Sequence, residues 1–238
     1  MITHALVLTA GLGTRLRPLT LTRAKPAIGV GGIPLIRRIV TWLAREGVVD
    51  LVLNLHYLPH TIAEIVGDGS DMGAHVRYSW EQPAILGSAG GPRHALPVIG
   101  ADTFFIINGD TLTDLALEPM ARAHAASGAL VTMALVPNVD PTRYGGVRLA
   151  DDGRVIGFAR RGPGAAGSYH FIGVQIARAE VFAGLADGEA IDSLEGVYDP
   201  LIASRPGSVR GYLCDAEFWD IGTPEDHAKT DAAYMGRK

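Results

Sequence analysis

Cysteine is nearly absent from this chain of 238 residues, in which Cys214 is the only one. A single thiol excludes an internal disulfide and any zinc site built from several thiolates. We expect Cys214 to be a small buried apolar residue. The thiol content fits a reducing compartment, and the start of the chain has no cationic segment ahead of an apolar one. We therefore expect a cytoplasmic protein.

Long apolar runs and an excess of positive charge are also missing. No apolar run approaches the roughly 20 residues that a membrane helix needs. The formal net charge is −4, with 19% charged residues. This balance leaves no cationic surface for a nucleic-acid backbone or an anionic membrane, so neither is an expected partner. Any phosphate must be bound by a few well-placed groups.

Hydrophobic residues make up 47% of the chain, enough for one large core. No linker divides the sequence, so we expect a single domain over residues 1–238. In the first half, short apolar runs alternate with amphipathic segments, which predicts a mainly parallel sheet with crossover helices. The expected strands are 5–9, 50–54, 75–80, 103–108 and 129–136. The expected helices are 34–46, 58–66, 89–95 and 117–127.

The second half has a different pattern. Asp151-Asp-Gly153 predicts a tight turn, because Asp-Gly supplies the positive φ that such turns need. This turn would join strands at 146–149 and 154–159. A further strand is expected over 170–177, and a closing helix over 224–235.

A glycine-rich segment follows the first expected strand. It reads Ala10-Gly-Leu-Gly-Thr-Arg-Leu-Arg-Pro-Leu-Thr20, and Lys25 comes shortly after it. Glycines let backbone N–H groups approach a phosphate closely, and Arg and Lys supply charge to a triphosphate. The spacing matches neither a full dinucleotide fingerprint nor a P-loop. On spacing alone, a phosphate loop and a structural turn are equally supported.

Two acids are candidate metal ligands. Asp110 ends the apolar strand Phe104-Phe-Ile-Ile-Asn-Gly-Asp110, and ligands collect at the carboxyl ends of strands in open α/β sheets. The alternative for Asp110 is a cap on the following turn. Asp220 lies among bulky apolar residues, where an unpaired acid is unfavourable. Because Thr223 can cap the helix that starts at Pro224, a ligand role is favoured for Asp220.

Together these segments resemble the sugar-1-phosphate nucleotidyltransferases along nearly the whole chain. The matching segments are 11–20, Lys25-Pro26, Gly32-Ile-Pro-Leu-Ile36, 108–110 and Trp219-Asp-Ile-Gly-Thr-Pro-Glu225. The chain is most similar to the short, single-domain members, which include N-acetylmuramate-1-phosphate uridylyltransferases and bacterial mannose-1-phosphate guanylyltransferases. The resemblance implies a Rossmann-like α/β fold, a mainly parallel sheet flanked by helices with an inserted sugar-binding β region. The nucleotide-binding half would span about 1–136, and the sugar-binding region and closing helix about 137–238.

The resemblance also implies roles for individual residues. The nucleotide would be bound by Ala10, Gly11, Gly13 and Thr14, with its base read at Glu81 and Gly87. The catalytic cations would be Arg15, on the phosphates, and Lys25, on the α-phosphate. Mg²⁺ would be the cofactor, held by Asp110 and Asp220. The sugar would contact Asn108, Gly146 and His170.

The sugar side departs from the family pattern. Many relatives place Glu-Lys-Pro after the hairpin, whereas this chain reads Phe158-Ala-Arg-Arg-Gly162, which leaves Arg160 or Arg161 as candidate replacements. The expected reaction transfers a nucleoside monophosphate from UTP or GTP to a sugar 1-phosphate and releases pyrophosphate. Two alternatives stay open: a catalytically inactive nucleotide-sugar-binding subunit, and a transferase for a non-sugar phosphate such as phosphocholine. The sequence does not predict the base, the sugar or the oligomeric state.

Overall fold

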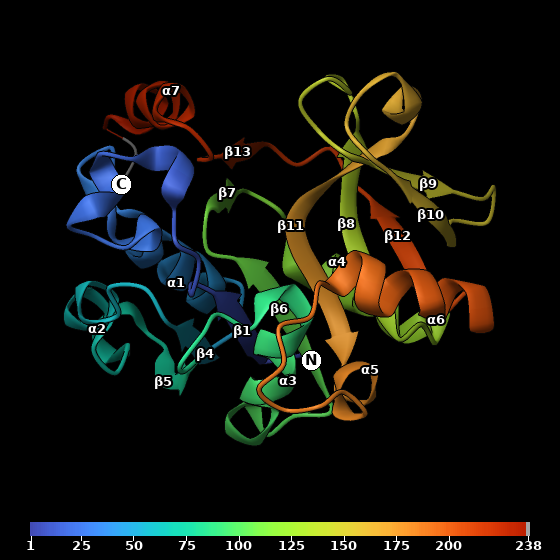
Figure 1. Ribbon diagram of the computed structural model, residues 1–238, viewed down its shortest axis with the longest axis horizontal. Coiled ribbons are helices and arrows are strands. Elements are labelled where there is room, and N and C mark those ends of the chain that lie inside the picture. Colours follow the sequence, from blue (N-terminus) through green and yellow to red (C-terminus); the bar gives the residue numbers. More distant parts are fainter. Residues whose placement is uncertain (237–238) are drawn as a thin grey trace.

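Four neighbouring strands run parallel to one another within a large sheet in this computed structural model, which describes residues 1–236 (Figure 1). They are β1 (His4–Leu8), β4 (Asp50–Leu55), β5 (His75–Trp80) and β6 (Thr103–Asn108), in the spatial order β6-β1-β4-β5. Residues of both faces are buried, as Ala5, Leu6 and Val7 of β1 show. Near-continuous apolar runs are typical of parallel strands that are covered by helices on both sides.

Helices cover the two faces of this sheet. The longer helices are α1 (Leu35–Arg45), α2 (His60–Val66), α3 (Gly87–Ile99) and α4 (Leu117–Ser127). Short helices α5 (Glu180–Ala183) and α6 (Asp199–Ser204) follow later in the chain. One core cluster joins Ala5 and Val7 to α1, α2 and α4, and a second joins Leu6 to α3 and α5. The period-two alternation along β1 therefore divides the interior into two layers.

The remaining strands make the sheet mixed. They are β8 (Val131–Pro137), β9 (Gly146–Leu149), β10 (Val155–Ala159), β11 (Tyr169–Arg178) and β12 (Val209–Leu213). The long β11 runs antiparallel to β6, β8 and β9, while β12 is parallel to β8. The predicted hairpin is confirmed as the antiparallel pair β9 and β10, with Gly153 at φ 82° in its turn. The sequence did not predict β12.

A small two-stranded sheet joins a segment near the C-terminus to the segment that follows β6. It pairs β7 (Thr111–Thr113) with β13 (Phe218–Asp220), so that Asp220 lies opposite Thr111. Helix α7 (Pro224–Tyr234) follows and is capped as predicted, since the Thr223 hydroxyl accepts a hydrogen bond from the Asp226 N–H at 3.2 Å. It packs on the β2 (Gly29–Val30) and β3 (Ile33–Pro34) hairpin. Within residues 1–236, none of the helices combines the length and apolar character of a membrane span.

Candidate active site

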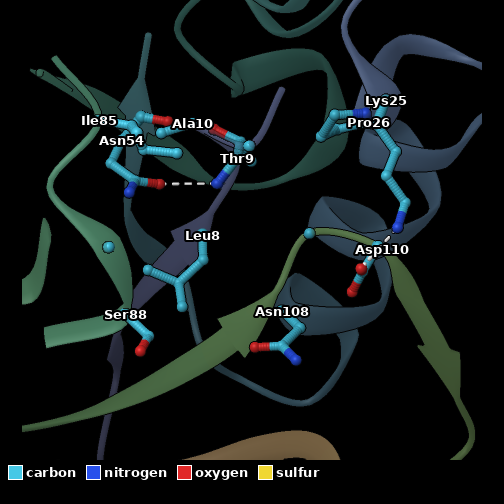
Figure 2. A pocket seen from close by; sticks show the side chains of 13 residues that line it. Leu8, Thr9, Ala10, Lys25, Pro26, Asn54, Ile85, Ser88, Asn108 and Asp110 are labelled. Carbon is cyan, nitrogen blue, oxygen red and sulfur yellow. Dashed lines mark hydrogen bonds and ion pairs between the residues drawn. The ribbon is translucent and has the colours of Figure 1, made fainter. Parts of the chain in front are cut away.

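Two adjoining cavities lie where β1, β4 and β6 end. The first, of about 290 Å³, is lined by the end of β1, the glycine-rich segment, Lys25, Asp110 and the start of α3 (Figure 2). The second, of about 240 Å³, is lined by residues 11–16 and Gly222. The cavities share Gly11, Lys25 and Asp110, which stand at their boundary. The carboxyl edge of the parallel strands is where an α/β sheet is expected to bind a ligand.

The two glycines of the loop are needed for different reasons. Gly13 has a φ of +62°, and a Cβ there would lie 2.8 Å from Thr20 Cγ2. Its carbonyl accepts hydrogen bonds from Thr20 Oγ1 at 2.8 Å and from the Leu16 N–H at 3.0 Å. A Cβ on Gly11, in contrast, would meet no atom within 4 Å. Gly13 therefore sets the shape of the loop, while Gly11 leaves open space in the cavities.

Lys25 and Asp110 are partners in this structure. Lys25 Nζ lies 2.6 Å from Asp110 Oδ2, and their side chains are 11% and 31% exposed (Figure 2). The sequence assigned these groups to different targets, a phosphate and a metal ion. Here each group is the ion-pair partner of the other. The pair engages one of the three N–H donors of Lys25 and one of the two oxygens of Asp110, so a phosphate or a metal ion would bind beside this ion pair or in exchange for it.

The second acid reaches the same place through the β7 and β13 pair. The Ile221 N–H donates to the Asp110 carbonyl at 3.1 Å, which fixes Asp220 beside Asp110. Burial, and next the Asp110 charge, raise the pKa of Asp220 above its ordinary value, with Lys25 acting in the opposite direction. A Cβ on Gly222 would lie 3.3 Å from Asp220 Oδ2 and 3.5 Å from Arg15 Nη1. Arg15 and Asp220 thus flank Gly222 at the edge of the second cavity.

These carboxylates fit a magnesium ion that is shared with a substrate. In the described part of the chain, no three His, Cys, Asp or Glu side chains gather as a metal cluster. Mg²⁺ is commonly held by one or two carboxylates together with substrate phosphates and water. Two neighbouring acids, one of them with a raised pKa, are the donor set that such an ion would stabilise.

Glu81 lies behind the cavity wall rather than in the cavity. Its side chain is 0% exposed, and its two oxygens accept hydrogen bonds from Asn54 Nδ2 and from the Leu86 N–H, each at 2.7 Å. The expected contact between Glu81 and a base is therefore not available in this arrangement. Gly87 does line the first cavity; its φ is +76°, and a Cβ there would lie 2.7 Å from the Ile191 carbonyl oxygen.

Asn54 is a cavity residue that the sequence reasoning missed. It is 3% exposed, and its Oδ1 accepts a hydrogen bond from the Thr9 N–H at 2.6 Å (Figure 2). Asn54 thereby ties the end of β4 to the end of β1. The available signal was the single amide within the otherwise apolar run Leu51-Val-Leu-Asn-Leu55.

The predicted sugar residues lie in two places. Asn108 lines the first cavity near Asp110 (Figure 2). His170 instead stacks with Tyr144 and Phe218, with ring centroids 4.1 Å and 4.9 Å away. Burial lowers the pKa of His170 to about 4, and the charge of Arg143 acts in the same direction. The imidazole is therefore neutral at pH 7.

The other residues expected to contact the sugar do not line either cavity. Gly146 is buried, and a Cβ there would overlap Ser168 Oγ, so this glycine serves close packing. Arg160 is 93% exposed and pairs with Glu195 at 3.1 Å, and neither it nor Arg161 lines the two cavities.

Arg143 is a cation close to Tyr144 that the sequence analysis did not name. Its guanidinium lies 5.0 Å from the centre of the Tyr144 ring and pairs with Asp226 at 2.6 Å. It therefore stands beside the aromatic group formed by Tyr144, His170 and Phe218.

Comparison with known proteins gives consistent results. Mannose-1-phosphate guanylyltransferase of Mycobacterium tuberculosis is 31% identical over 98% of this chain, and the chain spans 65% of that relative's length. D-glycero-alpha-D-manno-heptose 1-phosphate guanylyltransferase of Aneurinibacillus thermoaerophilus is 31% identical over 95% of this chain and 96% of its own. N-acetylmuramate alpha-1-phosphate uridylyltransferase of Neisseria meningitidis is 35% identical over 77% of this chain and 79% of its own.

The fold has counterparts among solved structures. The crystal structure of HddC from Yersinia pseudotuberculosis complexed with GMP-PN has a TM-score of 0.83 and 24% identity, covering 98% of this chain and 100% of the other. The nucleotidyl transferase family model matches residues 4–234. The expected α/β fold and the family resemblance are thereby confirmed: the chain belongs to the nucleotidyl transferase family.

Proposed function

We propose that this chain transfers a nucleoside monophosphate from a nucleoside triphosphate to a sugar 1-phosphate and releases pyrophosphate, with Mg²⁺ as cofactor. The observation that carries the proposal is the meeting of Lys25 and Asp110 at the boundary of the two cavities, with Arg15 and Asp220 beside them. The named relatives, all sugar-phosphate nucleotidyltransferases, support the same reaction.

The chemistry needs charge control more than proton transfer. A phosphate oxygen of the sugar 1-phosphate, already anionic near pH 7, attacks the α-phosphorus, and the bond to the pyrophosphate breaks. Lys25 offsets charge at the α-phosphorus, and Arg15 stabilises the leaving pyrophosphate. Mg²⁺ held by Asp110 and Asp220 would neutralise phosphate charge. The rest of the rate enhancement comes from holding the two phosphates in line.

We infer that GTP is the preferred nucleotide. Both guanylyltransferases described above match at least 95% of this chain, whereas the uridylyltransferase matches 77% of it. Because both Glu81 oxygens are engaged within the protein, we assign base recognition to the cavity-lining residues 8–11, 85, 87 and 88. Backbone N–H and C=O groups in these segments can recognise a base edge.

A matrix of GTP, UTP, CTP, ATP and dTTP against sugar 1-phosphates, read by pyrophosphate release, tests this function. We expect the highest turnover with GTP and an aldohexose or heptose 1-phosphate, and loss of turnover when a chelator removes Mg²⁺. Asp220→Asn is the control for contaminating activity. Nucleotide binding without turnover in every combination would indicate a regulatory subunit. Turnover only with CTP and phosphocholine would indicate the non-sugar alternative.

A further inference from the structure

Glu81 has no task in the proposed reaction, yet its carboxylate is fully buried and fully hydrogen-bonded. Both of its donors, the Asn54 amide and the Leu86 N–H, are neutral groups. A buried carboxylate without its hydrogen bonds would be strongly destabilising, so these contacts are tightly specified. A fixed group that joins separate segments next to a ligand cavity has the characteristics of a positioning residue.

The hydrogen bonds of this network can run in only one direction. The Leu86 N–H and the Thr9 N–H are backbone donors and cannot accept. Glu81 accepts at both oxygens, so Asn54 must turn its NH₂ towards Glu81 and its oxygen towards Thr9. The carboxylate thereby determines which way the Asn54 amide faces. The amide oxygen holds the Thr9 N–H at the end of β1, and the Thr9 hydroxyl, which donates to the Asn54 carbonyl, adds to the same connection.

The three segments that are joined form walls of the first cavity. Thr9 precedes the glycine-rich loop, Asn54 lies near the end of β4, and Leu86 directly precedes Gly87 at the start of α3. Space for the network is kept open by Gly91, where a Cβ would lie 2.6 Å from Glu81 Oε1 and 3.0 Å from Asn54 Nδ2. The backbone of Glu81 is held independently, since its N–H donates to the Leu55 carbonyl at 2.9 Å.

We propose that Glu81 is a positioning residue that sets the spacing of the nucleotide cavity through Asn54 and Leu86, without touching the nucleotide. This inference rests on the proposed function, because it assigns the first cavity to the nucleotide. It predicts that GTP binding depends on the pattern of hydrogen-bond donors and acceptors more than on which residue carries each group. Single substitutions break this pattern, and exchanging the carboxylate of Glu81 with the amide of Asn54 restores it.

The experiment compares Glu81→Gln, Asn54→Asp and the double variant with the parent. In Glu81→Gln one amide donor must face another donor, at Leu86, at Asn54 or, if the Asn54 amide flips, at the Thr9 N–H. In Asn54→Asp a carboxylate oxygen faces Glu81. In the double variant, the amide at position 81 donates its N–H to the carboxylate at position 54 and accepts from the Leu86 N–H through its oxygen. The carboxylate at position 54 also accepts from the Thr9 N–H. Every donor then again meets an acceptor, and the net charge of the parent is kept.

We expect each single variant to raise the Michaelis constant for GTP roughly ten- to hundredfold, the usual effect of one buried unmatched polar group. The catalytic rate should change much less, and the preference among bases and the Michaelis constant for the sugar 1-phosphate should stay as in the parent. The double variant should return to within about threefold of the parent. Glu64→Gln, at an exposed acid on α2, is the matched control and should have no effect.

Three results would overturn the inference. An altered base preference in Glu81→Gln that Asn54→Asp does not reverse would make Glu81 a base contact. Parental Michaelis constants in the folded single variants would leave the network without influence on the cavity. If the single variants melt at a lower temperature but bind GTP with the parent's affinity, and the double variant melts like the parent, the network is purely structural. If the parent turns over no substrate pair, the proposed function fails, but the inference about Glu81 can still be tested. Calorimetric measurement of GTP binding then gives the same comparison among the variants.

Discussion

Replacing Lys25 by Met tests the centre of the proposed mechanism. Met keeps much of the apolar stem of a side chain that is 11% exposed, and removes the ammonium that lies 2.6 Å from Asp110 Oδ2. The substitution therefore has two direct consequences. The α-phosphorus loses its neutralising charge, and Asp110 loses its partner.

The catalytic rate and the stability should both fall, by different amounts. Loss of one preorganised group that faces developing charge lowers the catalytic rate by about 10²- to 10³-fold, or roughly 3–4 kcal/mol. The stability effect is smaller, on the order of 1 kcal/mol, because Asp110 is 31% exposed and can be hydrated. Metal binding without nucleotide should become tighter, since the ammonium no longer competes for the carboxylate.

Steady-state kinetics at saturating substrates, Mn²⁺ titration followed by electron paramagnetic resonance, and thermal melts measure these effects. Lys25→Arg keeps the charge and the pair with Asp110, so it should bind Mn²⁺ as the parent does. Arg37→Met removes an exposed ion pair with Asp71, 2.7 Å between N and O, and should change neither rate nor metal affinity. A parental rate in folded Lys25→Met, or weaker Mn²⁺ binding, would refute the reasoning.

Three further predictions follow from the geometry. Asp110→Asn and Asp220→Asn should each lower turnover by at least about 10²-fold with little change in melting temperature, and a fully active variant would remove that acid from the metal site. Gly13→Ala should lower the free energy of unfolding by about 1–3 kcal/mol because Gly13 has a φ of +62°. Gly11→Ala should melt like the parent but bind GTP more weakly. A destabilised Gly11→Ala beside a stable Gly13→Ala would contradict the assigned roles. Burial, with the Arg178 charge acting in the same direction, lowers the pKa of His124 to about 4 from an ordinary 6.5. The unfolded chain then binds the proton first, so the contribution of His124 to stability should be full above pH 6.5 and fall towards pH 4, by on the order of 1–2 kcal/mol at pH 5 in urea unfolding. Because the pKa of His170 is lowered to about 4 as well, His124→Gln should remove about half of the dependence that the two histidines cause, and an unchanged dependence would contradict this assignment.

The parallel half of the fold was predictable because local and tertiary requirements agree there. The apolar residues of α1 recur at helical spacing, and Leu35, Ile36, Ile39, Val40 and Leu43 are all 0% exposed. The strand β12 was not predictable in the same way. It is a short run, Val-Arg-Gly-Tyr-Leu, whose strand conformation depends on pairing with β8 in a distant part of the sequence. Its partner, rather than its own composition, determines its structure.

The site was predictable where the chain itself supplies the geometry. Asp110 follows a strand closely, so its position at the carboxyl edge of the sheet can be read from the sequence. The Lys25 ion pair with Asp110 and the amide of Asn54 depend on contacts between distant segments. The sequence singled out Lys25 and offered a single amide in an apolar run at Asn54, but residue type does not identify the partner that either side chain meets in the fold.

The fully buried Glu81 and the half-buried Asp220 illustrate why burial alone does not assign a role. Glu81 receives two neutral N–H donors, and these hydrogen bonds stabilise its carboxylate without any ligand. Asp220 lies beside a second acid, and burial together with that neighbour raises its pKa. A cation would relieve the repulsion at Asp220, whereas it would find no free oxygen at Glu81. The difference lies in the partners that the fold brings to each acid, and it is the reason for proposing a metal ligand at Asp220 and a positioning residue at Glu81.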